Sequence, residues 1–269
     1  MAIIARSSNT RIDSFWEPAQ SAVSEHIRIE NGKIRFEIEE GKLRDKVFRS
    51  ELRTRVTGKL VNGFRMKIAF TLELGTDEKA DSSAVIFQLW DSGSPSNSIQ
   101  WRNNTNQIFY RISGDNVKSK DTPLFIAEKG KPVRVVVDIT ARSDAKGHIV
   151  VYANGKKVMD YKGRNLYDKI DPDGYPKIGL YDSDKWPKGI RNRVIYFSDI
   201  VIADGDTPIE ELLGEAPGQP QPEPEPKPVE PKPVTPNREV EELKKKVADL
   251  SKENAELMSK IQQVKNIFS

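Results

Sequence analysis

The sequence of 269 residues contains no cysteine, which excludes a disulfide framework, a thiolate zinc site and a cysteine nucleophile. An excess of one charge is also missing, because 43 basic and 40 acidic residues leave a formal net charge of +3. This balance predicts no nucleic-acid partner from bulk charge. No apolar run approaches the roughly 18 residues needed to span a bilayer, so we expect no membrane span. Residues 1–9 lack the basic region and apolar core of a signal peptide, and we expect none.

Short runs rich in Val, Ile, Phe and Tyr, separated by Gly, Asn, Asp and Pro, predict an all-β domain over residues 1–205. The Asn154-Gly155 pair between two such runs predicts a tight hairpin with positive φ at both turn positions. Many evenly spaced strands without amphipathic helices favour a two-sheet sandwich or a jelly roll. The expected strands include 33–39, 64–74, 83–90, 107–112, 132–140, 148–153, 157–161, 177–181 and 193–202, besides a strand at 49–53 and a strand region at 27–36.

The pattern of short strands ends near residue 205. Residues 206–214 predict one or two helical turns. Between residues 217 and 236, nine of twenty residues are proline, a composition that prevents a helix or a central strand. We therefore interpret residues 215–236 as an extended polyproline-like stalk, which at about 3.1 Å per residue reaches roughly 60 Å.

Residues 237–269 carry a heptad repeat with an apolar seam, which predicts a coiled-coil oligomerisation helix. β-branched residues at a, Leu at d and a central Asn254 favour a parallel dimer, whereas Val264 and Phe268 leave a trimer open. A single amphipathic helix that folds back on the sandwich is the alternative, although the long stalk argues against it. The seam consists of Val240, Val247, Asn254, Ile261 and Phe268 at a, and of Leu243, Leu250, Leu257 and Val264 at d.

Two predicted strands far apart in the chain each combine an apolar face with a charged one. Successive side chains of a strand point to opposite faces, so Arg49, Glu51, Arg53 and Arg55 share one face of the first strand. Lys177 and Tyr181 share one face of the second strand. Such consistently polar faces predict a surface that holds an anionic ligand, with the two strands close together as walls of one groove.

The motifs Arg49-Ser50-Glu51-Leu52-Arg53, Gln88-Leu89-Trp90 and Tyr175-Pro176-Lys177-Ile178-Gly179-Leu180-Tyr181 resemble, in this order, those of jelly-roll alginate lyases. Related lyases that act on glucuronan or heparin share the same concanavalin-like sandwich. The resemblance spans most of residues 20–205. It implies a concanavalin-like β-jelly roll that binds acidic polysaccharides and cleaves them by β-elimination.

The resemblance also implies roles for single residues. Arg53 and Gln88 would bind the uronate carboxylate, with Arg49 and Arg55 nearby, and Tyr181 would act as acid and as base beside Lys177. A guanidinium matches a carboxylate in shape, and stabilising the developing enolate is usually the largest catalytic contribution. The family usually has His where this chain has Trp90, so we expect Trp90 to stack on sugars instead.

Four further candidate site residues each allow a functional and a structural interpretation. Trp101, Tyr110 and Arg102 extend the groove as sugar subsites, or they are ordinary sheet residues. Glu51 contacts the substrate, or it is a counter-ion that orients Arg49 and Arg53. The aspartates at 91, 182 and 184 do not have the spacing of a calcium loop, so we predict no metal and no other cofactor.

These features together predict a multivalent acidic-polysaccharide-binding protein with a lyase-like groove, clustered by its coiled coil so that avidity rises. The architecture is that of a phage appendage, which suggests a virion surface or extracellular location and a capsid or tail protein as a further partner. The alternatives are an active polysaccharide lyase that uses Tyr181, and a structural spike without a glycan ligand.

Overall fold

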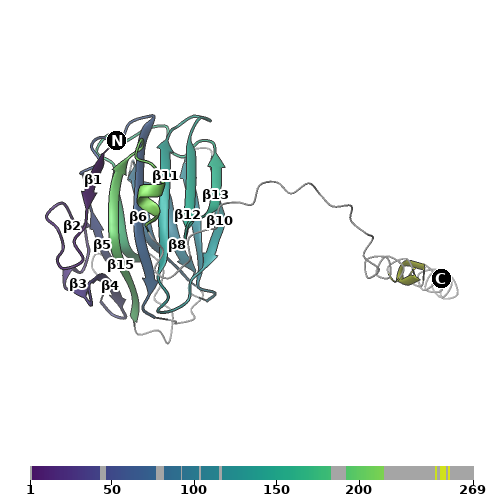
Figure 1. The fold of residues 1–269 in the computed structure, drawn as a ribbon, viewed down its shortest axis with the longest axis horizontal. Helices are drawn as coiled ribbons and strands as arrows, with labels where there is room; N and C mark the ends of the chain where they lie inside the picture. The colour runs from purple at the N-terminus through teal and green to yellow at the C-terminus, as the bar shows by residue number, and fades with distance from the viewer. Residues whose placement is uncertain are drawn as a thin grey trace. The chain divides into compact units, whose positions relative to one another are not determined.

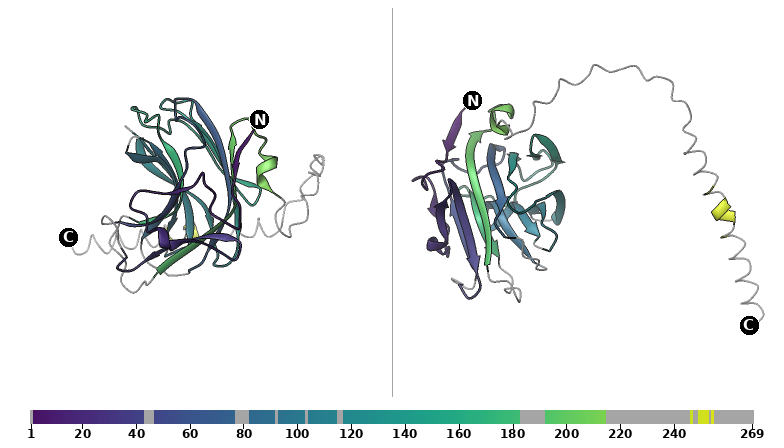
Figure 2. Two further views of the ribbon diagram at one scale, coloured as in Figure 1. Left: turned by 90° about the vertical axis from the view of Figure 1, so that its left-hand side faces the viewer. Right: turned by 60° about the horizontal axis from the view of Figure 1, so that its bottom comes forward.

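The computed structural model describes residues 2–42, 47–76, 82–91, 93–102, 104–114, 117–182 and 192–214, and, near the C-terminus, residues 246, 249–252 and 254. The chain divides into two compact units, Met1–Gln219 and Pro220–Ser269. Unit 1 is a sandwich of two antiparallel β-sheets (Figures 1 and 2). No helix of the described residues is long and apolar enough to cross a membrane.

The first sheet contains eight strands, in the order β13-β12-β11-β6-β15-β4-β3 with β1 paired to β15. Its strands are β1 (Ile3–Arg6), β3 (Ile27–Glu30), β4 (Lys33–Glu39), β6 (Phe64–Leu74), β11 (Val133–Ala141), β12 (His148–Ala153), β13 (Lys156–Lys162) and β15 (Asn192–Asp204).

The second sheet contains seven strands, in the order β10-β9-β8-β7-β14-β5-β2. Its strands are β2 (Glu17–Pro18), β5 (Phe48–Arg53), β7 (Ser83–Asp91), β8 (Ser94–Arg102), β9 (Gln107–Gly114), β10 (Val117–Ile126) and β14 (Tyr175–Asp182). A 3-10 turn, η1 (Ser24–His26), precedes β3.

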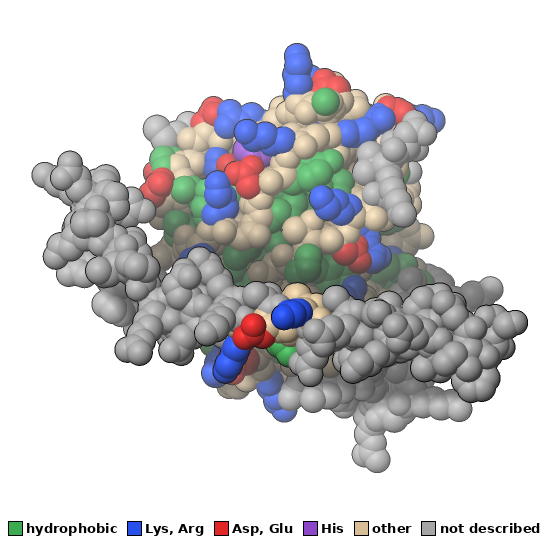
Figure 3. Space-filling view, turned by 90° about the vertical axis from the view of Figure 1, so that its right-hand side faces the viewer, with side chains coloured by type: hydrophobic (Ala, Val, Ile, Leu, Met, Phe, Trp, Pro, Cys, Tyr) green, Lys and Arg blue, Asp and Glu red, His purple; other side chains and the backbone are tan. Residues whose placement is uncertain are grey.

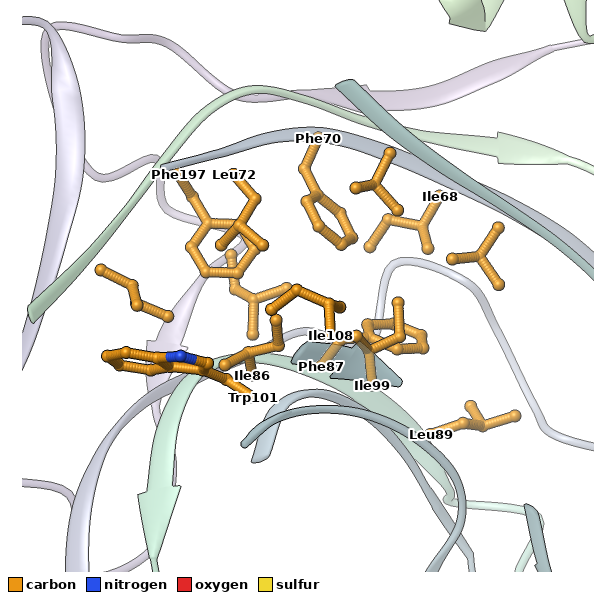
Figure 4. Close-up of a cluster of buried hydrophobic side chains, with 14 of the residues drawn as sticks. Ile68, Phe70, Leu72, Ile86, Phe87, Leu89, Ile99, Trp101, Ile108 and Phe197 are labelled. Carbon is orange, nitrogen blue, oxygen red and sulfur yellow. The ribbon is translucent and has the colours of Figure 1, made fainter. Parts of the chain in front are cut away.

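The hydrophobic core lies between the two sheets (Figure 4). Ile68, Phe70 and Phe197 enter it from the first sheet, and they meet Phe87 and Trp101 from the second. The alternation of apolar and polar residues along each strand places one face of each sheet in this core and leaves the other face outward. Figure 3 shows basic and acidic side chains interspersed on one side of the molecule.

The predicted all-β sandwich is confirmed, and the expected strands 33–39, 64–74 and 148–153 have the observed bounds. The Asn154-Gly155 hairpin is confirmed as well, since both residues have positive φ, 47° and 77°. Strands β1, β2, β8 and β10 were not among the expected strands, whereas β3 lies within the expected strand region 27–36. β8 was missed because its polar Ser94–Asn97 segment hides the alternation that follows.

After β15 the chain forms one helical turn, α1 (Glu210–Leu213), within the predicted segment 206–214. Leu212 of this turn packs on the outer side of the first sheet against Ala69, Val136 and Val201 (Figure 1). The Arg134 guanidinium fixes the turn through hydrogen bonds to the Leu212 carbonyl at 3.0 and 2.8 Å.

The stalk predicted at residues 215–236 lies outside the described residues. Of the predicted heptad positions, Leu250 and Asn254 are described, and both are helical and exposed in the single chain. The coiled coil therefore stays a prediction. The positions outside the described residues are Val240, Leu243, Val247, Leu257, Ile261, Val264 and Phe268.

Candidate functional site

Strand pairing places the predicted charged strands next to each other in the second sheet. Arg49 lies opposite Tyr181 and Arg53 opposite Lys177, across the β5–β14 pair. Lys177 in turn lies opposite Gln88 of β7. The predicted convergence of these residues is confirmed, but they lie side by side on one face of one sheet and not on opposite walls. We call this outward face of the second sheet the polar face.

Glu51 and Gln88 form the buried centre of the polar face. Glu51 is 0% exposed, and Gln88 Nε2 donates a hydrogen bond to Glu51 Oε1 at 2.5 Å. Burial raises the pKa of Glu51, while the charges of Lys177 and Arg49 and the Gln88 hydrogen bond act in the opposite direction. This carboxylate lies beneath the surface and balances the cations around it.

Lys177 belongs to the same centre, with an exposed fraction of 3%. Its Nζ lies 3.9 Å from the centre of the Trp90 ring and 5.7 Å from that of Tyr175. Burial lowers the pKa of Lys177 to about 8, and the charges of Arg49 and Arg53 lower it further, against the opposing effect of Glu51. A lysine that exchanges its proton near neutral pH is unusual, and such shifted groups gather at functional sites.

Two arginine–tyrosine pairs form an accessible rim around this centre. The Arg49 guanidinium lies 4.5 Å from the Tyr181 ring centre, and its Nε lies 3.1 Å from Glu51 Oε2. The Arg53 guanidinium lies 5.2 Å from the Tyr175 ring centre and donates to the Tyr175 hydroxyl at 3.3 Å. Arg55, just beyond β5, lies 5.5 Å from the same Tyr175 ring.

The polar face carries more positive than negative charge. Among the residues that the structure describes, the rim and centre hold four cations (Arg49, Arg53, Arg55 and Lys177), and the carboxylates in contact with them are Glu51 and Glu17. Glu17 reaches Arg53 from β2 at 2.9 Å and is half exposed. The excess of two positive charges, held next to aromatic rings, suits a ligand that combines carboxylates with apolar faces.

Three site predictions need correction. Trp101 and Tyr110 are both 0% exposed and lie in the core between the sheets, so neither is a sugar subsite; burial also raises the pKa of Tyr110. For Glu51, which is 0% exposed, the structure fits the counter-ion reading. Gln88 is 1% exposed and bonded to Glu51, and its role toward the uronate carboxylate stays a prediction. Arg53 pairs with Glu17, and Glu51 orients Arg49 alone.

Tyr175 was missed as a site residue. It stands two residues before Lys177, and on a strand this spacing puts both side chains on the same face. The motif therefore already indicated that Tyr175 shares a face with Lys177. The hydrogen bond from Arg53 to the Tyr175 hydroxyl, by contrast, depends on the pairing of β5 with β14.

Trp90 lies two residues after Gln88 on the polar face, opposite Tyr175. One surface of its indole is in contact with the Lys177 ammonium, which leaves less of the ring for a sugar. The histidines have other partners: His26 lies 3.6 Å from Glu39 and His148 lies 2.8 Å from Asp160. Among the described contacts, neither histidine meets the polar face.

The three aspartates whose spacing does not match a calcium loop have protein partners where they are described. Asp91 accepts hydrogen bonds from the backbone amides of Tyr167 and Asp171, and Asp182 forms a buried ion pair with Arg193. Asp184 lies outside the described residues. Within the described ranges, no group of three or more potential ligands has metal-binding geometry.

Comparison with solved structures finds the same sandwich in lyases. The endo-β-1,4-glucuronan lyase of the fungus Trichoderma reesei is similar with a TM-score of 0.54 and 18% identity over 74% of this chain and 100% of that one. The alginate lyase of Klebsiella pneumoniae has a TM-score of 0.54 and 13% identity over 67% and 84% of the two chains. An alginate lyase variant in complex with an alginate trisaccharide has a TM-score of 0.55 and 12% identity over 76% and 99%.

At these identities the solved structures establish the fold. A search of curated protein sequences finds no match to this chain. The family evidence comes from a sequence model described as polysaccharide lyase, which matches residues 7–201, most of the chain and nearly all of the sandwich. This chain belongs to the polysaccharide lyase family.

Proposed function

We propose that the chain binds an acidic polysaccharide on the polar face and cleaves it by β-elimination. The observation that carries this proposal is the excess of two positive charges next to Tyr181 and Tyr175. Family membership supports the reaction class, and solved lyases with this fold act on glucuronan and alginate.

The reaction requires three things of the protein. Arg49 and Arg53 offset the charge of the uronate carboxylate, which makes the C5 proton more acidic. Tyr181 removes that proton, the bond from C4 to the glycosidic oxygen breaks as the C4–C5 double bond forms, and Tyr181 returns the proton to the leaving oxygen. Lys177 acts from below, since its positive charge beside Trp90 adds to the potential that attracts the anion.

The test is incubation of the full chain with glucuronan, alginate and heparin while the absorbance of the unsaturated product is followed. We expect product with the natural chain and none with Tyr181→Phe. Tyr152→Phe is the matched control, because Tyr152 lies on β12 of the first sheet. Equal product from both variants would exclude the role of Tyr181.

A binding protein without turnover is the second candidate. Trp90 occupies the position where the family usually has a histidine, and Lys177 covers part of its ring. In that case no product forms with any polysaccharide, whereas binding to immobilised glucuronan or alginate persists and weakens in Arg49→Gln and Arg53→Gln.

We further propose that the C-terminal heptads join two or three chains, so that several heads engage one polymer. The pattern of apolar residues from Val240 to Val264 supports this oligomer, and the proline-rich stalk would give each head reach. Such clustering suits a virion appendage anchored to a capsid or tail protein. Sedimentation equilibrium of the full chain should give a dimer or trimer, and Leu250→Lys should give a monomer.

A further inference from the structure

We propose a second anion-binding subsite on the polar face, formed by Arg102 and Arg111 around Phe109, that takes another carboxylate of the same polysaccharide. This inference rests on the proposed function and extends it along the polymer. It concerns β8, β9 and β10, on the opposite side of β7 from β14 and β5.

Strand register places the second subsite in line with the first. Lys177 lies opposite Gln88, Gln88 opposite Ser98, and Ser98 opposite Arg111. Directly opposed residues of antiparallel strands share a face, so this row crosses the polar face perpendicular to the strands. Arg111 stands three strands away from Lys177, which corresponds to about 14 Å at the usual strand spacing.

The side chains of β9 alternate between the core and the polar face. Ile108, Tyr110 and Ile112 of β9 point into the core, whereas Phe109 and Arg111 lie on the opposite face. Phe109 is 1% exposed although it is not part of the core between the sheets. Two guanidinium groups cover it: Arg102 at 4.9 Å and Arg111 at 5.5 Å from its ring centre.

This arrangement leaves the guanidinium edge of Arg102 available, while Asp121 occupies the Nε–Nη2 edge of Arg111. An arginine stacked on an aromatic ring keeps its planar N–H edge for a carboxylate. Both side chains remain partly exposed, at 43% for Arg102 and 37% for Arg111. Asp121 is the carboxylate between them: it accepts from Arg111 Nε at 2.7 Å and Nη2 at 2.8 Å, and lies 3.7 Å from Arg102. Among the described residues of these strands, two cations thus share one carboxylate, which leaves an excess of one positive charge.

The competing explanation is that Arg111 and Asp121 only clamp β9 to β10, since they are directly opposed across that pair. The two explanations predict different effects of ligand length on affinity. A second subsite raises the affinity only of oligosaccharides long enough to extend from β7 to β9. A structural clamp changes the stability of the fold and has the same effect on the binding of short and long ligands.

The experiment measures binding of glucuronan and alginate oligosaccharides, from trisaccharides to long oligomers, by isothermal titration calorimetry. We expect the natural chain to bind long oligomers more tightly than trisaccharides. Arg102→Gln and Arg111→Gln should each weaken binding of long oligomers about fivefold and leave trisaccharides unchanged. Arg65→Gln is the matched control, because Arg65 is a half-exposed arginine paired with Asp206 on the first sheet.

The variant Asp121→Asn should have the opposite effect on affinity from the two arginine variants, which makes it a sharper test. Loss of the competing carboxylate frees Arg111, so affinity for long oligomers should rise, while a structural clamp would only lose stability. If Arg111→Gln does not fold, as judged by its circular dichroism, Arg102→Gln and Asp121→Asn carry the test.

An unchanged length dependence in Arg102→Gln, or equal weakening of trisaccharides, would overturn the second subsite and leave the proposed function intact. Failure of the natural chain to bind any of the acidic oligosaccharides would overturn both.

Discussion

Gln88 of β7 donates a hydrogen bond to Glu51 of β5 across the intervening strand β14. The β14 residue opposite Glu51 is Gly179. Gly179 has a φ of +132°, and a Cβ there would clash with the Ser50 carbonyl oxygen and approach the ring of Phe36 in the core. The motif therefore needs a glycine at this position both for its backbone conformation and for the close approach of β5.

The first prediction concerns this buried carboxylate. Glu51→Ala should lower the free energy of unfolding by about 3 kcal/mol, because Arg49 and Lys177 lose their counter-ion in a buried setting. Glu17→Gln is the matched control, since Glu17 pairs with Arg53 while half exposed, and should cost less than about 1 kcal/mol. Urea denaturation measures both, and equal losses would contradict the buried role of Glu51.

The second prediction concerns the charge of Lys177. Its pKa in the folded chain is about 8 rather than 10.5, so the ammonium is lost as the pH rises through 8. Binding of an acidic oligosaccharide should therefore weaken about threefold from pH 7 to pH 9 at constant ionic strength. Lys177→Arg keeps its charge over this range, so calorimetry should show an affinity that depends less on pH. If the affinity of this variant falls with pH as steeply as that of the natural chain, a group other than Lys177 causes the pH dependence.

The same shift has a consequence for stability. The folded pKa of Lys177 lies below the unfolded one, so between pH 8 and 10.5 the unfolded chain binds more protons. The contribution of this lysine to the free energy of unfolding therefore increases as the pH rises through that window.

The third prediction concerns Glu37 of β4, which lies outside the site. Hydrogen bonds from Arg35 and Asn192 and the charge of Arg28 outweigh burial and lower its pKa from 4.5 to about 2. Its folded pKa is depressed, so its stabilisation is complete above pH 4.5 and is lost as the pH falls towards 2. Glu37→Gln should remove about 2 kcal/mol at pH 7 and little at pH 2, measured by urea denaturation at each pH. A loss that does not depend on pH would contradict the shift.

The fourth prediction distinguishes the roles of Trp90 and Trp101. Trp101→Ala should destabilise the fold by about 4 kcal/mol, because it empties a site in the core. Trp90→Ala should cost about 1 kcal/mol through the lost contact with Lys177, and it should change oligosaccharide affinity. Thermal denaturation and calorimetry distinguish them; a stable Trp101→Ala variant with weakened binding would restore Trp101 as a subsite.

Several features could be predicted from local sequence because they depend on local physics. The period-two pattern identified strands such as 33–39, 64–74 and 148–153, and the Asn-Gly pair identified the turn at Asn154-Gly155, since alternation and positive φ are properties of neighbouring residues. The same alternation could have assigned Trp101 to the core, because Trp101 stands two residues after Ile99 and between polar Gln100 and Arg102. Tyr110 stands likewise between Ile108 and Ile112.

The sequence by itself determined that Arg49, Arg53, Lys177 and Tyr181 lie on outward strand faces, because the pleat alternates whatever the neighbouring strand is. Only the tertiary structure decided that β14 lies between β5 and β7, and hence that Glu51 and Gln88 meet below the surface. It also decided that Arg111 stands in line with Lys177. Strand order and register depend on how both sheets bury their apolar faces together, which no single strand specifies.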